Sequence, residues 1–151
     1  MSDRRESGPH GAGPAPSVFV ATRPGDADCA RRILADLTEF LREAGLGADR
    51  IATVELVAAE SINNVVEHAY QDVPGPVYLR AALCPDLLEL VIRDRGQPLP
   101  VALIHAVSPP ADPQDLPEGG FGWHLIHSLV DDVDHDRLAQ WNQLRLVFRI
   151  S

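Results

Sequence analysis

The segment VELVAAESINNVVEHAY, residues 54–70, constrains the fold most, because its apolar side chains recur at steps of three and four. That spacing predicts a long helix with one buried face. The apolar face comprises Val54, Val57, Ala58, Ile62, Val65, Val66 and Ala69. A second stripe contains Glu60, Asn64 and either Glu67 or His68, each about one turn from the last. The helix is therefore expected to carry polar groups beside its buried face.

This polar stripe has two interpretations. A carboxylate one turn from a carboxamide places a hard oxygen ligand beside a group that can take a proton, as a magnesium–nucleotide site requires. Alternatively, Glu60 and Asn64 lie on a solvated face, and Asn63 or Asn64 caps a nearby backbone group. The helix alone does not decide between them.

Composition excludes several classes of protein. The chain has 151 residues, of which 45% are hydrophobic, enough for one domain with a core. Its net charge of −9 argues against a surface for nucleic acid or for an acidic membrane. All 13 basic residues are arginine. The absence of lysine excludes a Walker A loop, the strand lysine of eukaryotic-type protein kinases and a Schiff base on the protein.

The sequence favours a cytoplasmic location. No apolar run approaches the roughly 18 residues that cross a bilayer, and the N-terminus lacks the apolar core of a signal peptide. Cys29 and Cys84 lie far apart without ligand spacing, so they are expected to be small buried hydrophobic side chains in a reducing compartment.

The order of the expected elements predicts an α+β fold. Residues 1–16, rich in Gly, Pro and charge, are expected to form a disordered tail, and residues 17–151 one domain. Strands are expected at 17–22, 77–84, 87–93, 132–137 and 143–150, and helices from Asp26 or Asp28 to about 44, from 48 or 49 to 70, and at about 122–130. The loop 94–121 has the length of a lid. The simplest packing is a two-layer sandwich, in which helices cover one face of a mostly antiparallel sheet.

Two further motifs lie outside the long helix. Asp94 ends an apolar strand, and Gly96 follows two residues later. An aspartate there can accept a hydrogen bond from an exocyclic amine, and the glycine lets the backbone approach a flat ring; a type I turn is the alternative. Gly120, Phe121 and Gly122 come directly before a helix, where successive amides can converge on an anion.

The order of these motifs resembles that of the GHKL ATPases, which include gyrase, histidine kinases and MutL. The shared order is E-x-x-x-N on a helix, D-x-G at a strand end and G-x-G at the start of a helix, and the likeness covers roughly residues 17–151. Within that family the chain most resembles the small anti-sigma-factor serine/threonine kinases, and the stretch LVDDV, residues 129–133, adds to the likeness. The resemblance implies the family's two-layer fold, with ATP and Mg²⁺ as cofactors.

The resemblance also implies roles for residues of the long helix. Glu60 corresponds to the general base, and Asn64 to the residue that holds the magnesium ion. Asn63, about 100° round the helix from Asn64, is then left to packing or capping. His68, two turns after Glu60, would neighbour the nucleotide or cap the helix end.

The other two motifs would form the remaining walls of the nucleotide pocket. By resemblance, Asp94 accepts a hydrogen bond from the adenine amino group, and Gly96 lines the base pocket. Gly120 and Gly122 would bind the phosphates, with Phe121 between them in the same loop.

The function that the resemblance implies is a serine/threonine-protein kinase that acts as an anti-sigma factor. Such a kinase phosphorylates a serine of a STAS-type anti-anti-sigma protein and holds a sigma factor when that partner is modified. The resemblance implies that a homodimer is one assembly open to the chain, and an exposed strand such as 17–22 could pair across a two-fold axis. No direct contact with nucleic acid or a membrane is expected.

Departures from the family pattern leave alternatives open. Glu118 stands where these kinases often carry a basic residue, and Trp141-Asn142-Gln143 replaces a frequent Gly-Thr. Both changes favour a non-catalytic ATP-sensing module that sequesters a regulatory partner.

A detached catalytic domain of a histidine kinase is a further alternative, although no helical hairpin with a phosphoacceptor histidine precedes the domain. His124 and His127 have metal-ligand spacing but lack a nearby acidic third ligand, so they are expected to flank a packed helix.

Overall fold

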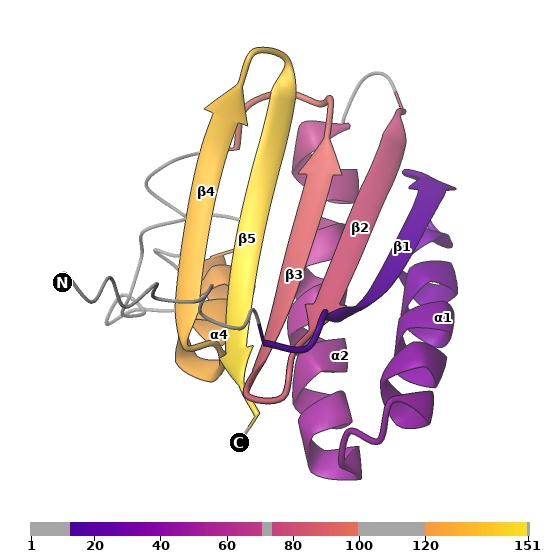
Figure 1. Cartoon of the computed structure of the whole chain (residues 1–151). Helices are drawn as coiled ribbons and strands as arrows, with labels where there is room; N and C mark the ends of the chain where they lie inside the picture. Colours follow the sequence, from indigo (N-terminus) through magenta and orange to yellow (C-terminus); the bar gives the residue numbers. More distant parts are fainter. Residues whose placement is uncertain (1–12, 71–73, 100–119, 151) are drawn as a thin grey trace, which may run out of the picture.

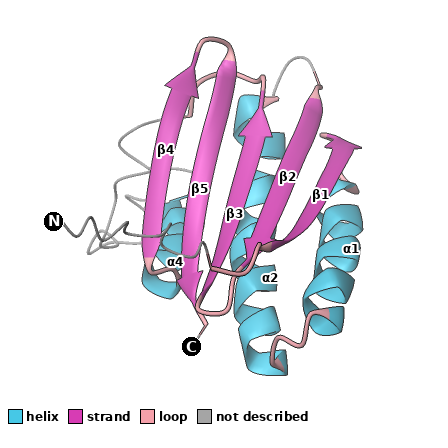
Figure 2. Ribbon diagram, viewed as in Figure 1, coloured by secondary structure: helices cyan, strands magenta, loops and turns pink. Residues whose placement is uncertain are grey.

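Five strands form one antiparallel sheet, and the helices cover one of its faces (Figures 1 and 2). The computed structural model describes residues 13–70, 74–99 and 120–150. The strand order is β1-β2-β3-β5-β4, and every neighbouring pair is antiparallel. The elements are β1 (Ser17–Pro24), α1 (Cys29–Glu43), α2 (Ala48–Asn64), a π-helical turn η1 (Val65–Ala69), β2 (Pro76–Leu83), β3 (Leu87–Asp94), α4 (Gly120–Leu129), β4 (Asp132–Leu138) and β5 (Trp141–Arg149). The expected α+β two-layer fold is confirmed.

Alternation along the strands separates the core from the outer face of the sheet. In β5, Leu144, Leu146 and Phe148 are buried under the helices, whereas Gln143 and Arg145, which alternate with them, are half-buried on the other face. Side chains in a strand point to opposite faces in turn, so a period of two produces one covered and one open face. The expected strand ranges are confirmed to within a few residues, with β1 running two residues further than expected.

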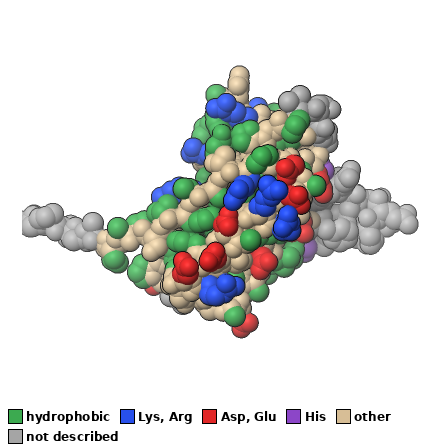
Figure 3. Space-filling view, turned by 90° about the vertical axis from the view of Figure 1, so that its right-hand side faces the viewer, with side chains coloured by type: hydrophobic (Ala, Val, Ile, Leu, Met, Phe, Trp, Pro, Cys, Tyr) green, Lys and Arg blue, Asp and Glu red, His purple; other side chains and the backbone are tan. Residues whose placement is uncertain are grey.

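Helix α1 packs on the β1 side of the sheet through a buried stripe of Ile33, Leu37 and Leu41. Phe40 is partly buried and stacks on Phe19 of β1 with ring centroids 5.5 Å apart. The flank formed by β1 and α1 carries acidic and basic side chains beside one another (Figure 3). Asp28 occupies the N-cap position as expected but makes no side-chain capping hydrogen bond.

The helix expected to end at residue 70 changes its hydrogen bonding before that point. All of its predicted apolar face is buried except Val66, which is partly buried. From Val65 the turn widens, and the N–H of Tyr70 donates to the carbonyl of Val65 at 3.2 Å. The carbonyl of Ala69 accepts from the N–H of Gln97 at 2.8 Å, which ties the helix end to the loop after β3. The expectation of one uninterrupted α-helix is therefore wrong in its last turn.

Helix α4 begins at Gly120, earlier than expected. Gly120, Phe121 and Gly122 thus form its first turn rather than a loop before it. Residues 1–12 of the expected tail and residues 100–119 of the expected lid, including Glu118, lie outside the described residues. None of the helices that the structure describes is long and apolar enough to cross a membrane.

Candidate functional site

Four polar side chains are buried within residues 13–70, 74–99 and 120–150: Ser61, Asn64, Asp94 and Asn142. Ser61 is satisfied within its own helix, because its Oγ donates to the carbonyl of Val57 at 2.7 Å. A buried polar group costs free energy unless it has a partner. The surroundings of the other three therefore indicate what this part of the molecule is built to hold.

Asn64, the last residue of α2, has 4% of its surface exposed. Its Nδ2 has no hydrogen-bond partner among the described residues. Asn63 beside it is exposed, so the structure separates the two asparagines as the helical spacing predicted. Leaving a buried amide unpaired costs about 1–3 kcal/mol, which makes Asn64 suited to contacting a ligand.

Helix α4 approaches α2 closely at Glu60. A Cβ atom placed on Gly122 would lie 2.7 Å from Oε2 of Glu60 and 3.7 Å from Nδ2 of Asn64. Only a residue without a side chain allows this approach without displacing the carboxylate. Two motifs far apart in the sequence are therefore brought together, and the half-buried Glu60 carboxylate lies against the first turn of α4.

The first turn of α4 is where backbone N–H groups have no partner inside the helix. These groups and the helix dipole attract anions. The sequence placed this capacity in a glycine loop, whereas the structure places Gly120 and Gly122 within the helix itself. The side chain of Phe121 lies outside the described part of the chain.

His68 lies in η1, with 17% of its side chain exposed. Its Nε2 makes no hydrogen bond within the described residues and lies 3.9 Å from Oε2 of Glu67. Its place on the stripe of Glu60 and Asn64 and its contact with a nucleotide both stay predictions.

Asp94 ends β3 with 1% of its surface exposed. Its Oδ1 accepts hydrogen bonds from the N–H of Gly96 and from Nδ2 of Asn142, both at 2.8 Å. Burial raises the pKa of Asp94, and the hydrogen bonds from Asn142 and Gly96 oppose that rise. Both of these hydrogen bonds use Oδ1, so they leave Oδ2 without a donor from either residue.

Gly96 lies directly against the end of the long helix. A Cβ atom on it would lie 2.3 Å from the carbonyl oxygen of Ala69. The N–H of the next residue, Gln97, donates to that oxygen. The D-x-G motif is therefore attached to the end of the helix that carries Glu60 and Asn64. The close approach that requires a glycine at position 96 is to the carbonyl of Ala69, and the approach of Gly96 to a flat ring stays a prediction.

Sequence reasoning missed the residues that hold this loop. Asn142 also donates to the carbonyl of Gln97 at 2.9 Å, and Nη1 of Arg137 donates to Oδ1 of Asn142 at 3.0 Å and to the carbonyl of Gly96 at 2.7 Å. The signal was present in the alternation of WNQLRLVFRI, because Asn142 occupies a core-facing position. In the sequence alone, Asn142 stands out only as part of a departure from the family pattern.

Arg93 and Arg95, the cations nearest to Asp94 in sequence, make their contacts on the outer face of the sheet. Nε of Arg93 donates to Oε1 of Gln143 at 2.8 Å. The guanidinium carbon of Arg95 lies 4.3 Å from the centroid of the Trp141 ring, an arrangement that favours the cation. Both guanidinium groups are thus engaged with β5 side chains.

The residues present fit a magnesium–nucleotide complex. Magnesium prefers oxygen ligands and usually takes one or two of them from the protein, the rest coming from water and phosphates. Asn64 has a carboxamide oxygen that can bind the ion, and its partnerless buried Nδ2, which donates and does not bind metal, favours a hydrogen-bond acceptor such as a phosphate oxygen beside it. Within the described residues, no three His, Cys, Asp or Glu side chains gather as a metal site.

Comparisons with known proteins identify the family. The family model described as the histidine kinase-like ATPase domain matches residues 24–148. The chain belongs to this family. The match includes α2, the end of β3 and α4, so the expected resemblance to the GHKL ATPases is confirmed.

Relatives within the family are named serine-protein kinases. RsbW of Halalkalibacterium halodurans is 30% identical over 123 residues, which cover 79% of this chain and 75% of that protein. RsbW of Oceanobacillus iheyensis is 32% identical over 102 residues, which cover 64% of this chain and 65% of that protein.

Solved structures confirm the fold. The structure of the RsbU and RsbW domains of Rv1364c from Mycobacterium tuberculosis matches 89% of this chain with a TM-score of 0.65 and 25% identity. This chain spans 32% of that longer protein. The histidine kinase domain of the Erythrobacter litoralis blue-light activated kinase matches 80% of this chain and 61% of that one, with a TM-score of 0.50 and 16% identity, and supports the fold alone.

Proposed function

We propose that this protein is an ATP-binding serine/threonine-protein kinase that acts as an anti-sigma factor in a partner-switching pathway. Its substrate is a serine of a STAS-type anti-anti-sigma protein, its second partner is a sigma factor, and it works in the cytoplasm. The relatives named serine-protein kinase support the activity. The observation that carries the proposal is the contact of Gly122 with Glu60, because it joins an anion-attracting helix end to a candidate base.

Each element contributes one part of the proposed phosphoryl transfer, which depends mainly on positioning and charge neutralisation. Magnesium-ATP supplies the phosphoryl group and the charge that neutralises its oxygens. Glu60 takes the proton of the serine hydroxyl, and Asn64 holds the magnesium ion. Asp94 accepts a hydrogen bond from the adenine amino group while Asn142 holds its other oxygen. The remaining proposed nucleotide-binding residues are His68, Gly96, Gly120, Phe121 and Gly122.

Transfer of labelled γ-phosphate to candidate STAS proteins tests the activity. We expect transfer by the wild type and a loss of roughly 100-fold or more in Glu60→Gln, the usual effect of removing a general base. Glu55→Gln is the matched control, because Glu55 is exposed on the same helix. Absence of transfer with every partner, despite measurable ATP binding, would contradict the kinase.

Magnesium-dependent ATP affinity tests the site itself. We expect Asp94→Asn to weaken binding with or without magnesium, and Asn64→Ala to weaken it mainly when magnesium is present. Asn63→Ala is the control for Asn64, since it is the exposed neighbour in the same helix. Unaltered affinity in both site variants would show that the motifs were assigned wrongly.

A non-catalytic ATP-sensing module that sequesters a regulatory partner is the second candidate. Glu118 in place of a basic residue, and the absence of lysine from the chain, favour it. Phosphate transfer and partner affinity, measured together, separate the two candidates. A kinase transfers phosphate as the wild type and loses that transfer in Glu60→Gln. A module that only binds transfers no phosphate even as the wild type, and its Glu60→Gln variant keeps its affinity for the partner.

A homodimer is the proposed assembly.

A further inference from the structure

A row of three polar side chains runs across the ends of β3, β5 and β4, on the face of the sheet that the helices cover. Asp94 lies directly opposite Asn142, and Asn142 lies directly opposite Arg137. Side chains directly opposite each other on neighbouring strands point to the same face and interact. Asp94 and Asn142 are each 1% exposed, whereas Arg137 at the end of the row reaches solvent. Arg137 is therefore placed to act on Asp94 through Asn142.

Arg137 fixes which way round the amide of Asn142 lies. A guanidinium group has only donors, so the atom that faces it must be an acceptor. Nη1 of Arg137 donates to Oδ1 of Asn142 at 3.0 Å and to the carbonyl of Gly96 at 2.7 Å. Nδ2 of Asn142 then faces two acceptors, Oδ1 of Asp94 at 2.8 Å and the carbonyl of Gln97 at 2.9 Å. A reversed amide would set a donor against a donor and an oxygen against two oxygens.

The direction of the Asn142 amide decides what Asp94 can offer a ligand. An N–H that donates to a carboxyl group favours its ionised form, and the ionised form only accepts hydrogen bonds. Burial raises the pKa of Asp94, and the hydrogen bonds from Asn142 and Gly96 lower it. The positive charges of Arg137 and of protonated His135, both on β4, lower this pKa further. If the amide were reversed, its oxygen would require a proton on Asp94, and the acid would become a donor.

We propose that Arg137 is a positioning residue that sets the base specificity of the nucleotide site. By holding the amide of Asn142 in one orientation, it keeps Asp94 an acceptor, and an acceptor favours adenine, whose exocyclic amino group donates. Hypoxanthine carries a carbonyl oxygen at the same place, which an acceptor repels. The inference rests on the contact of Asp94 with adenine under the proposed function, and it adds the residue that makes this contact selective.

The loop that Arg137 contacts does not depend on this arginine alone. The N–H of Arg95 donates to the hydroxyl of Tyr70, and the N–H of Gln97 donates to the carbonyl of Ala69, both at 2.8 Å. Both acceptors belong to the end of the long helix, a different element from the strand of Arg137. Removal of Arg137 should therefore leave the loop in place and release the amide that it orients, so that specificity changes more than stability.

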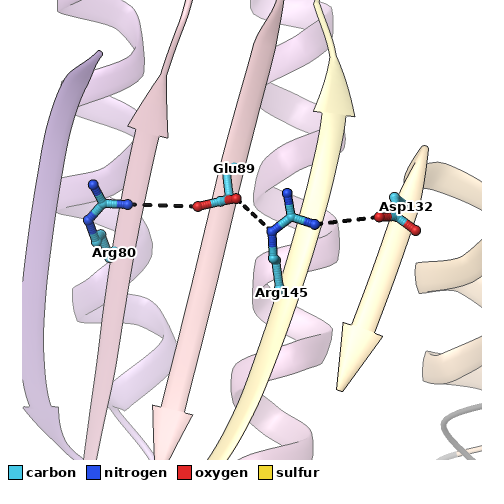
Figure 4. Close-up of polar contacts among 4 residues, drawn as sticks. All are labelled: Arg80, Glu89, Asp132 and Arg145. Carbon is cyan, nitrogen blue, oxygen red and sulfur yellow. Dashed lines mark hydrogen bonds and ion pairs between the residues drawn. The ribbon is translucent and has the colours of Figure 1, made fainter. Parts of the chain in front are cut away.

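Arg145 on β5 offers a matched control, because it also holds polar partners but on the opposite face of the sheet (Figure 4). Its Nε lies 2.6 Å from Oε2 of Glu89, and its Nη1 lies 3.5 Å from Oδ2 of Asp132. Glu89 also has a second arginine, since Nη1 of Arg80 lies 3.7 Å from its Oε1. Replacement of Arg145 therefore removes a cation of the sheet while the row that ends at Asp94 stays intact.

Affinities of the full chain for ATP and for inosine triphosphate, measured with magnesium by calorimetry, test the proposal. The readout is the ratio of the two affinities. We expect the wild type to prefer ATP by about tenfold or more, the effect of one hydrogen bond to a charged group. Arg137→Met should reduce this ratio by at least about threefold, whereas Arg145→Met should leave it unchanged. Arg137→Lys should retain most of the ratio, because an ammonium group also only donates.

Two further substitutions show how Arg137 acts. The side chain in Arg137→Gln can accept as well as donate, so this variant should also lower the ratio, and it keeps the test valid where Arg137→Met loses its fold. Asn142→Ala should lower the ratio by itself. Adding Arg137→Met to Asn142→Ala should lower it no further, because the arginine acts through that amide.

A wild-type ratio that persists in Arg137→Met and Arg137→Gln would overturn the proposal, even where both affinities fall, since a merely structural role weakens the two nucleotides alike. Additive effects of Arg137→Met and Asn142→Ala would overturn it as well. A wild type that binds both nucleotides equally would remove the role of Asp94, and one that binds neither would remove the nucleotide site. These last two outcomes also overturn the proposal, but they are failures of the proposed function and are recognised before any substitution is made.

Discussion

Asp94 is a carboxylate in surroundings that oppose its ionisation. Burial raises its pKa, and the hydrogen bonds from Asn142 and Gly96 only partly counter that effect. Asp94→Asn keeps an oxygen that can accept both bonds and removes the charge. We expect its melting temperature to be unchanged or higher and its ATP affinity to fall at least about tenfold, because hydrogen bonds to charged groups contribute roughly 1.5–3 kcal/mol. A variant that melts earlier yet binds ATP normally would contradict this role.

The same carboxylate gives a pH dependence with a defined sign. Because the pKa of folded Asp94 lies above its ordinary value of 3.8, its contribution to stability is greatest below 3.8 and is lost as pH rises through the higher folded value. Nucleotide binding behaves oppositely, since only the ionised form accepts two hydrogen bonds at full strength. The ATP affinity of the wild type is therefore divided by that of Asp94→Asn at each pH, because titration of the nucleotide affects both proteins equally and cancels. This ratio should fall towards one on acidification. A constant ratio down to pH 3.8 would contradict it.

The sequence predicts the orientation of a site residue where that orientation depends only on the spacing of residues along one helix or strand. Asn64 could be separated from Asn63 because 100° of helical rotation turns one inward and the other outward. Asn142 could be placed on the core-facing side of its strand but not joined to Asp94, since that contact depends on the pairing of β3 with β5. Arg137 offered no local signal for its hydrogen bond to the carbonyl of Gly96, because that carbonyl lies in the loop after β3.

At the scale of elements, η1 and the loop that follows β3 are packed so closely at Gly96 that a side chain there would clash. Gly96→Ala would place a Cβ 2.3 Å from the Ala69 carbonyl, which is backbone and cannot rotate away. We expect a loss of about 1–3 kcal/mol in the free energy of unfolding, measured by urea titration. Gly13→Ala, where nothing lies within 4 Å, should change nothing; equal stability of the two variants would contradict the tight contact.

The junction between α2 and α4 should respond differently. In Gly122→Ala the new Cβ meets Oε2 of Glu60, the far end of a flexible side chain. Alanine gains up to about 1 kcal/mol over glycine inside a helix, so we expect an equal or higher melting temperature. Displacement of Glu60 should nevertheless lower phosphoryl transfer. Full transfer in a stable Gly122→Ala variant would show that Glu60 needs no such position.

Element types were predictable, whereas two of their ends were not. The alternation of apolar residues identified the strands, and the steps of three and four identified α1 and α2. The π-helical turn ends at Ala69, whose carbonyl accepts from Gln97, and no local pattern reveals either feature. Helix α4 starts earlier than the sequence predicts, because Gly120 and Gly122, residues typical of a loop, lie in its first turn.

At the scale of the whole molecule, α2 and η1 join the separate parts of the site. Glu60 touches α4, and Ala69 touches the loop that follows Asp94. The sequence predicted the motifs and their order but not these junctions, since each depends on how the helices lie on the finished sheet. A ligand that contacts all three parts stabilises the fold as a unit, because it binds the folded chain alone.

Thermal unfolding with nucleotide tests this linkage. At a concentration 100 times its dissociation constant, a ligand adds about 2.7 kcal/mol, which raises the melting temperature of a domain of this size by roughly 5–11 °C. We expect this shift with magnesium-ATP for the wild type and Asn63→Ala. Asn64→Ala should lose the part that requires magnesium, and Asp94→Asn, with its affinity lowered about tenfold, roughly half of the shift at the same ATP concentration. Equal shifts in all four proteins would mean that the nucleotide stabilises the chain somewhere else, because neither Asn64 nor Asp94 would then contact it.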